Sequence, residues 1–392
     1  MKLTYKPLAN PLLILSDSPS LLSGLSRAGR DIASLAATLP QFRVGYLGRG
    51  GFNQRKFPWH QVDFPESAQW GEGYLERVWN DFSGGEPGVI LSNWDLSRLL
   101  WFTHPQGTGL EAFAGPNRNF QKWVYSPVDS TGPNGQTLSV ASQACLHGFD
   151  RACVASEFGC QVMRASGRTD ADWLPHGLWL DKFHPYANAK ALLGGDENGV
   201  YVGANMTNQA RKDMPAAFEC AAALRQEYGS KFKFWLHTDV LVRYWNVYAL
   251  AADYGVQDCL EVTTELTDEQ LAVRYSACDC TVNPTAGEGF SYVTAESQAC
   301  GTACVVTDYA AGAELVEEDC RVLPVAMRVD TQHNVLRAVL SGYGFAAKVK
   351  EQVERKRGDW EYRSEQLADR VSYLGWEKLK HPWTKWLLEG LK

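Results

Sequence analysis

The chain has 392 residues, enough for two domains, and its 45% hydrophobic and 21% charged content is ordinary for a soluble globular protein. The net charge of −7 lies wholly in residues 186–392, so neither half is a basic module that would bind nucleic acid through its bulk charge. No apolar run approaches the ~20 residues of a membrane-spanning helix, and LLIL near the N-terminus is too short for a signal sequence. We therefore expect a cytoplasmic protein without a membrane span.

The ten cysteines indicate the same compartment. They are scattered along the chain and form no CxxC pair, so the spacing typical of metal or redox sites is absent from the sequence. We expect most of them to be small core residues with reduced thiols, and we expect no metal site.

In the first half of the chain, short apolar runs alternate with amphipathic stretches. Residues 23–39 have the apolar spacing of a helix, whereas roughly 48–125 are rich in aromatic residues and glycine, have weak periodicity and predict long loops. Buried strands are predicted at 11–17, 42–48, 88–94, 123–129 and 152–156. The alternation of strand and helix predicts a parallel, doubly wound sheet.

The second half repeats this pattern after a crossover at residues 173–187, which has Pro and Gly punctuation and no periodicity. Helices are predicted at 212–229 and 266–278, and strands at 199–205, 231–237, 278–284 and 302–308. We expect an N-terminal domain over 1–180, a second domain over 181–365, and a C-terminal helix, 366–392, that packs back on the first domain.

The stretch Thr281–Asp308 reads TVNPTAGEGFSYVTAESQACGTACVVTD: a buried strand, a Gly-containing loop, a helix, a Gly stop and a second buried strand. Glu288 and Glu296 lie eight positions apart, so we expect both beside a helix N-terminus, where backbone N–H groups and the helix dipole favour a phosphate. Carboxylates for hydroxyls and a helix end for phosphates suit a sugar attached to a nucleoside diphosphate. Taken singly, each glutamate is as well explained as a helix cap or a dipole partner.

Three segments of the chain carry a family resemblance. EGFSYVTAESQACGTACVV resembles the Glu-x7-Glu signature of family 4 retaining glycosyltransferases, NQARKD (208–213) resembles the family's basic pair, and LPHGLWLDKFHP its inter-domain segment. The resemblance is strong over roughly residues 150–320. It implies the GT-B fold, two doubly wound Rossmann-like domains that face each other across a cleft. The matching positions of the signature are Glu288, Gly289, Phe290, Glu296, Ala299, Gly301 and Val305–Val306.

The resemblance implies a role for each of these residues. Glu288 would contact the hydroxyls of the donor sugar nearest the transferring carbon, and Glu296 the ribose hydroxyls. Arg211 and Lys212 would neutralise the diphosphate as it leaves, without a metal, although such a pair alone would more often be a solvated loop charge. The main-chain N–H groups that would contact sugar and phosphate are those of Gly289, Phe290 and Ser291.

The chain departs from the family pattern beside this loop. Ser291 stands where the family usually has Gly, Tyr292 where it has Leu, and Val293 where it has Pro. Because Ser291 and Tyr292 would border the sugar, these departures leave the identity of the sugar open rather than the reaction.

In the first half, two residues after predicted strands are candidates for the same site. Gly24 resembles the glycine of the family's first loop, which lets the backbone approach the donor phosphate, and is equally well a glycine at a helix start. Asp129 is predicted to face the cleft and to act on the sugar or the acceptor, the alternative being an Asx turn before Gly132.

A basic and aromatic segment at residues 43–61 is the candidate acceptor site. It has no acidic residue and reads as a flexible loop that could hold phosphates and stack bases, or as an ordinary solvated loop. The acceptor-binding candidates in it are Arg49, Arg55, Lys56 and Trp59.

These inferences predict a retaining hexosyltransferase with a nucleotide-sugar co-substrate and no other cofactor. The expected donor is UDP-glucose-like, with GDP-mannose second, and the acceptor is a hydroxyl whose carrier the sequence leaves open, the first hypothesis being a small molecule, lipid or glycan. Two alternatives stay open. One is transfer to hydroxymethylated bases in DNA, motivated by residues 43–61, and the other is a non-catalytic nucleotide-sugar-binding protein.

Overall fold

The computed structural model of the chain describes residues 9–51 and 56–391. The chain divides into two compact units: unit 1 consists of residues up to Gly177 together with Lys378 and the residues after it, and unit 2 is Leu178–Glu377. The sequence-based boundaries fall after residues 180 and 365.

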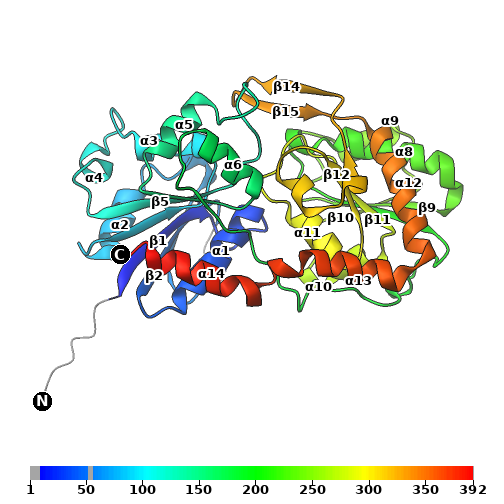
Figure 1. Cartoon of the computed structure of the whole chain (residues 1–392), viewed down its shortest axis with the longest axis horizontal. Coiled ribbons are helices and arrows are strands. Elements are labelled where there is room, and N and C mark those ends of the chain that lie inside the picture. Colours follow the sequence, from blue (N-terminus) through cyan, green and yellow to red (C-terminus); the bar gives the residue numbers. More distant parts are fainter. Residues whose placement is uncertain (1–8, 52–55, 392) are drawn as a thin grey trace, which may run out of the picture. The chain divides into compact units, whose positions relative to one another are not determined.

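Unit 1 is built on a seven-stranded sheet in the order β3-β2-β1-β4-β5-β6-β7, in which all neighbouring strands are parallel (Figure 1). Its strands are β1 (Asn10–Asp17), β2 (Phe42–Arg49), β3 (His60–Phe64), β4 (Gly88–Ser92), β5 (Phe120–Ser126), β6 (Arg151–Val154) and β7 (Asp172–Trp173). Its helices are α1 (Gly24–Ala37), α2 (Leu75–Ser83), α3 (Leu100–Thr103), α4 (Glu111–Ala114), α5 (Val140–His147), α6 (Glu157–Ala165) and most of α14 (Trp376–Glu389), with 3₁₀ turns η1 (Glu66–Ala68) and η2 (Leu96–Arg98).

Unit 2 has a six-stranded, fully parallel sheet in the order β10-β9-β8-β11-β12-β13, and a separate antiparallel hairpin, β14-β15. Its strands are β8 (Val200–Asn205), β9 (Phe232–His237), β10 (Leu260–Thr263), β11 (Cys280–Asn283), β12 (Cys304–Thr307), β13 (Arg321–Val322), β14 (Ala326–Asp330) and β15 (Val335–Val339). Its helices are α7 (Ala189–Leu192), α8 (Met214–Tyr228), α9 (Val247–Asp253), α10 (Asp268–Ala277), α11 (Tyr292–Ala299), α12 (Gly342–Gly358) and α13 (Trp360–Val371), with 3₁₀ turns η3 (Ala210–Lys212), η4 (Gly229–Lys231), η5 (Ala310–Leu315), η6 (Glu318–Cys320) and η7 (Ser372–Leu374).

The central strands are apolar on both faces because helices cover both sides of each sheet. In β1 the side chains of Leu12, Leu13, Ile14 and Leu15 are all fully buried. Each unit has its own hydrophobic core, one around Leu13 and Trp79 and the other around Val202 and Phe234. The prediction of two doubly wound, Rossmann-like domains is confirmed, and every strand predicted from the sequence is present.

The prediction of long loops in residues 48–125 was wrong. Strand β3 and helix α2 form there, between the predicted strands β2 and β4. Strand β3 is hard to recognise from apolar periodicity because it is short, lies at the edge of the sheet and has Phe64 as its one buried residue.

A second error concerns the single C-terminal helix predicted over 366–392. Helix α13 ends at Val371, and the 3₁₀ turn η7 and Gly375 separate it from α14. The break has a clear cause: Leu178 of the crossover donates its N–H to the carbonyl of Leu374 (2.7 Å), and its carbonyl accepts from the N–H of Trp376 (3.0 Å). Backbone groups that a continuous helix would use are therefore bonded to another segment.

Two tryptophans fix α14 against unit 1. The indole N–H of Trp383 donates to the carbonyl of Pro175 (3.1 Å), and that of Trp386 donates to the carboxylate of Asp172 (2.7 Å). A buried Trp with its N–H satisfied contributes a large apolar area at little polar cost.

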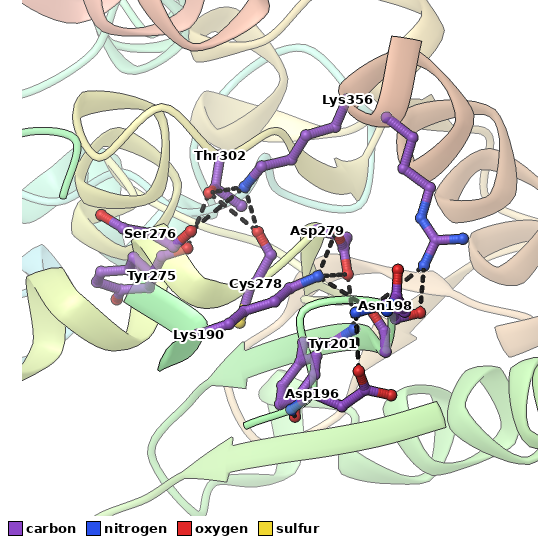
Figure 2. A network of polar contacts seen from close by, with 12 residues as sticks. Lys190, Asp196, Asn198, Tyr201, Tyr275, Ser276, Cys278, Asp279, Thr302 and Lys356 are labelled. Atoms are coloured by element: carbon purple, nitrogen blue, oxygen red, sulfur yellow. Dashed lines mark hydrogen bonds and ion pairs between the residues drawn. The ribbon is translucent and has the colours of Figure 1, made fainter. Parts of the chain in front are cut away.

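A buried polar network holds the N-terminal ends of β8 and β11 together (Figure 2). Lys356 of α12 donates to the carbonyls of Ser276 and Cys278 and to the hydroxyl of Thr302. Burial lowers the pKa of Lys356. Nearby, Lys190 pairs with Asp279 at 3.0 Å, and the carboxylate of Asp279, just before β11, accepts from the N–H of Tyr201 in β8 (2.8 Å). These contacts anchor the two strands whose opposite ends carry the residues described next.

Candidate functional site

The order of the second sheet reverses between β8 and β11. Open α/β sheets bind ligands outside the carboxyl ends of their strands at such a switch point. The loop after β8 ends in η3, which contains Arg211 and Lys212, and the loop after β11 contains Glu288. The structure thus brings the predicted basic pair and the first predicted carboxylate to one place in unit 2.

Arg211, Lys212 and Glu288 form a compact charge cluster. The ammonium of Lys212 donates to Oε2 of Glu288, and Nη1 of Arg211 lies 3.5 Å from Oε1 of the same carboxylate. The side chains of Lys212 and Glu288 are 9% and 11% exposed, whereas that of Arg211 is 28% exposed. Two cations thus share one carboxylate beyond the carboxyl ends of β8 and β11, and the arginine side chain stays partly exposed to solvent.

Backbone hydrogen bonds fix the loop that holds Glu288. The N–H of Ala286 donates to the carbonyl of Arg211 (2.7 Å), and Nη1 of Arg211 donates to the carbonyl of Gly287 (2.8 Å). On the other side, the carbonyl of Ala286 accepts from Ala338 of β15 (3.0 Å). Arg211 therefore supplies a positive charge beside Glu288 and also holds, by hydrogen bonds, the loop that contains Glu288.

The loop continues into α11 through an unusual residue. Ser291 caps the helix with its side chain, which accepts from the N–H of Thr294, and its φ of +80° lies in the left-handed region. Its hydroxyl also accepts from Nδ2 of Asn283 at 2.8 Å. Glycine adopts this conformation without strain, whereas a residue with a Cβ does not. The hydroxyl points into the protein, toward Asn283 and Thr294, so Ser291 acts here as a helix cap.

Glu296 lies further from the helix start than the sequence predicted. It is the fifth residue of α11, and its side chain is 3% exposed. Its Oε2 accepts a hydrogen bond from the hydroxyl of Tyr275 on α10 (3.1 Å), and that hydroxyl accepts one from Nδ2 of Asn205 (2.7 Å). Burial raises the pKa of Tyr275 well above its usual value, so the phenol stays a neutral donor.

The other predicted donor-binding residues of unit 2 lie between these groups. Gly289 and Phe290 are buried in the loop between Glu288 and α11. The carbonyl of Glu288 accepts from the N–H of Ala311 (3.1 Å). The loop is therefore held from both sides while its backbone leads directly into a helix N-terminus, the arrangement that binds phosphate in many proteins.

The loop after β9 lies beside the loop after β8, because β8 and β9 are parallel neighbours in the sheet. Asn208, which is fully buried, donates to the carbonyls of Val240 and Trp245 and accepts from the N–H of Trp245. It thereby joins the loop after β9 to the loop that carries Arg211. At the end of β9, burial lowers the pKa of His237 to about 4, so this histidine adds no positive charge near neutral pH.

Tyr275, Asn205 and Asn283 were not among the site residues predicted from the sequence. Asn205 and Asn283 are the last residues of β8 and β11, and that position beside the switch point was a usable signal. Tyr275 had no such signal, because its contact with Glu296 depends on how α10 and α11 pack.

Gly24 and Asp129, predicted to act on the donor or the acceptor, belong to unit 1. Gly24 is the first residue of α1 and follows Ser23, whose side chain caps the helix. It lies after β1, beside the reversal of strand order between β1 and β4. Asp129 lies three positions after the end of β5, and its Oδ1 accepts from the hydroxyl of Ser130 at 2.9 Å.

The segment 43–61, expected to be a flexible loop beyond the predicted strand 42–48, is not a loop throughout its remaining length. Its first part is β2, and β3 begins at His60. Arg43 pairs with Glu86 at 2.7 Å, and the guanidinium of Arg49 lies 4.4 Å from the ring centroid of Trp70 and donates to the carbonyl of Gln69. Strand formation commits both arginines to contacts within unit 1.

Two of the three remaining acceptor candidates lie in the described part of the chain. Lys56 is exposed, and Trp59 is stacked on Phe57 with ring centroids 4.9 Å apart. Arg55 lies outside the described residues.

All ten cysteines lie in the described part of the chain, and each is a buried, free thiol, as predicted. Within residues 9–51 and 56–391, no three His, Cys, Asp or Glu side chains are placed to hold a metal ion. In the same residues, no helix has both the length and the apolar character to cross a membrane.

Most of unit 2 is similar to a known protein family. Residues 197–355 match the family described as glycosyl transferases group 1. This stretch covers most of unit 2 and contains Arg211, Lys212, Glu288 and Glu296. A search of curated proteins found no match.

Several solved structures share the fold of the whole chain. Sucrose-phosphate synthase from Thermosynechococcus elongatus has 18% identity and a TM-score of 0.73, with 97% of this chain and 99% of that chain covered. HepE from Anabaena, solved with UDP-glucose, has 13% identity and a TM-score of 0.68 over 97% and 99% of the two chains. An E. coli structure described as trehalose-6-phosphate bound with UDP-2-fluoro glucose has 12% identity and a TM-score of 0.65 over 96% and 99%. The chain therefore has the GT-B fold of these glycosyltransferases.

Proposed function

We propose that this protein is a retaining glycosyltransferase of family 4 that moves a hexose from a nucleoside-diphosphate sugar to an acceptor hydroxyl without a metal. One observation carries the proposal: Arg211, Lys212 and Glu288 meet at the switch point of the second sheet, and Glu296 follows on the helix that begins there. The site combines cations for a diphosphate with carboxylates for hydroxyls.

The diphosphate of the donor would lie between the basic pair and the start of α11. As the bond to the sugar breaks, negative charge grows on the leaving phosphate, and preorganised cations stabilise that charge more than the ground state. Arg211 offers a bidentate fork to phosphate oxygens, and the first N–H groups of α11 add a positive helix end. These groups supply the charge that a metal provides in other enzymes.

The two glutamates would divide the rest of the donor between them. Glu288, beside the cations, would accept hydrogen bonds from hydroxyls of the transferred sugar, and Glu296 from the ribose. A UDP-glucose-like donor is our first choice, with GDP-mannose second. The choice is supported by the fold shared with structures that contain UDP-glucose or UDP-2-fluoro glucose.

For the acceptor we propose unit 1, with Asp129 acting on the sugar or the acceptor and Gly24 approaching the donor phosphate. Arg49, Arg55, Lys56 and Trp59 remain the acceptor candidates. The contacts of Arg43 with Glu86 and of Arg49 with Trp70 use two of the basic side chains on which the DNA alternative rested. We therefore favour a small-molecule or glycan acceptor over a hydroxymethylated base in DNA.

The first test is donor turnover in the presence of a broad acceptor panel. We expect UDP-glucose, or failing that GDP-mannose, to be consumed, and the anomeric configuration of the product to match that of the donor. Replacing Arg211 and Lys212 together by Ala should lower kcat about 100-fold or more, since each preorganised charge of this kind contributes about that factor. EDTA should leave the rate unchanged.

A matched control replaces two surface cations of the same unit, Arg225 and Lys350, which pair with Asp258 and Glu227. That double variant should retain full activity. Intact donor after long incubation with every acceptor would favour the non-catalytic alternative. Loss of activity in EDTA that Mn²⁺ restores would contradict the metal-free mechanism.

A further inference from the structure

The carboxylate of Glu296 is oriented by a short chain of buried hydrogen bonds. Nδ2 of Asn205 donates to the hydroxyl of Tyr275 (2.7 Å), and that hydroxyl donates to Oε2 of Glu296 (3.1 Å). Tyr275 is fully buried and Glu296 is 3% exposed. The three residues come from β8, α10 and α11, so the chain joins three elements at one point.

The direction of these bonds is fixed by chemistry. The amide nitrogen of Asn205 can only donate, so the phenolic oxygen of Tyr275 must accept from it. The phenolic proton is then available for one acceptor, which is Oε2 of Glu296. A carboxylate oxygen held in this way cannot rotate freely, and the remaining lone pairs of the carboxylate keep a constant direction.

The hydroxyl of Tyr275 does more than fill space. Its ring already packs edge-on against Trp235, with centroids 5.7 Å apart, and a phenylalanine would keep that contact. Burying a hydroxyl costs free energy unless it is hydrogen-bonded. A hydroxyl placed here, with a donor on one side and a carboxylate on the other, is suited to orient that carboxylate.

We propose that Tyr275, itself oriented by Asn205, is a positioning residue that fixes the Glu296 carboxylate for the vicinal hydroxyls of a ribose, and so makes the site prefer ribonucleotides. The proposal rests on the proposed function, because it takes the ligand of Glu296 to be the nucleoside of the donor. It assigns no contact between Tyr275 and the ligand.

The test compares two nucleotides that differ only at the hydroxyls in question. Binding of UDP and of 2′,3′-dideoxy-UDP is measured by titration calorimetry for the wild type, Tyr275→Phe and Asn205→Leu, and repeated with GDP and 2′,3′-dideoxy-GDP. Tyr201→Phe is the matched control, because its hydroxyl accepts from the N–H of Asp196 at the opposite end of β8 (Figure 2).

We expect the wild type to prefer the ribonucleotide by at least about tenfold, as for one hydrogen bond to a charged group. Tyr275→Phe should reduce that preference about fivefold or more by weakening ribonucleotide binding, with dideoxynucleotide binding unchanged. Asn205→Leu should change it in the same direction, and Tyr201→Phe should not change it. A merely structural role would weaken both nucleotides equally.

The outcomes separate this inference from the function on which it rests. Ribonucleotide binding with the same preference in wild type and Tyr275→Phe would overturn the positioning role and leave the donor site intact. Equal weakening of both nucleotides would do the same. Failure of the wild type to bind either ribonucleotide would overturn the proposed donor site and the positioning role together.

Discussion

Glu288 has two competing relations to the basic pair beside it. Its carboxylate accepts from Lys212 and lies 3.5 Å from Arg211. It therefore already pairs with the two cations that we assign to the diphosphate. A pair this poorly exposed interacts strongly, because little water screens it. The carboxylate would therefore weaken diphosphate binding while orienting the sugar.

Replacing Glu288 by Gln should separate these two effects. Gln keeps the size of the side chain and an acceptor for Lys212 but removes the negative charge, so we expect UDP to bind about fivefold more tightly, a gain of about 1 kcal/mol. Transfer should fall at least tenfold, since the charged acceptor for the sugar hydroxyls is lost. Calorimetry with UDP and steady-state kinetics measure the two quantities.

The control for this variant is Glu86→Gln, which removes a carboxylate paired with Arg43 in unit 1. It should alter neither UDP affinity nor turnover. Weaker UDP binding in Glu288→Gln would contradict the competition between the carboxylate and the diphosphate.

At the scale of residues, the sequence predicted the charged groups of the site better than the neutral ones. Glu288 was predicted because a carboxylate in a Gly-containing loop after a buried strand is visible in the sequence, and Arg211 and Lys212 because NQARKD resembles a family motif. Tyr275 and Asn205 were missed because a phenol and an amide become informative only through their partners, and Tyr275 lies 70 residues from Asn205 in the chain. No local periodicity encodes that contact.

The N-cap residue of helix α11 has one feature that stabilises the folded state and one that destabilises it. Ser291 supplies the cap and accepts from Asn283, which stabilises the helix start. Its φ of +80° costs about 1 kcal/mol or more for any residue with a Cβ. The cap offsets this strain, so the loop backbone before the helix keeps a conformation that Gly would adopt without cost.

Substitutions at Ser291 should therefore rank in an unusual order. Ser291→Ala keeps the strain, loses the cap and leaves Nδ2 of Asn283 short of an acceptor, so it should lower the free energy of unfolding by about 1–2 kcal/mol. Ser291→Gly loses the cap but relieves the strain and should be close to neutral. Urea unfolding gives both values.

Ser139, the N-cap of α5, provides the matched comparison because its φ is −60° and its side chain accepts from Ser142. The advantage of Gly over Ala should be larger at 291 than at 139. An equal difference at the two positions would show that the left-handed backbone of Ser291 carries no strain.

At the scale of elements, apolar periodicity predicted the strands well because each central strand is buried on both faces. It failed where a contact from elsewhere decides the backbone. The apolar spacing of the C-terminal segment continues across Leu374 and Gly375, yet the backbone bonds to Leu178 interrupt the helix there. The strand predicted at 42–48 is present as β2, but the loop expected after it gives way to β3 at His60, because an edge strand with mostly polar side chains has no clear apolar periodicity.

At the scale of the whole molecule, each unit has its own core and its own reversal of strand order, at β1/β4 in unit 1 and at β8/β11 in unit 2. The cations and carboxylates of the proposed donor site all belong to unit 2. Gly24, beside the reversal in unit 1, is a proposed contact of the donor phosphate outside it, and Asp129 of unit 1 is proposed to act on the sugar or the acceptor. Our proposal therefore expects each unit to make its own contribution to donor binding.

Hydrogen exchange with and without UDP-glucose can separate those contributions. At a ligand concentration 100 times Kd, openings that release the donor become about 100-fold rarer, equivalent to about 2.7 kcal/mol. We expect slower exchange in peptides that cover 205–213 and 285–300, because we propose that these loops hold the donor, and around Gly24. The variant with Arg211 and Lys212 replaced by Ala should lose the effect in all three regions at the same ligand concentration. Protection confined to unit 2 would contradict the role of Gly24, and protection confined to unit 1 would contradict the donor site at β8 and β11.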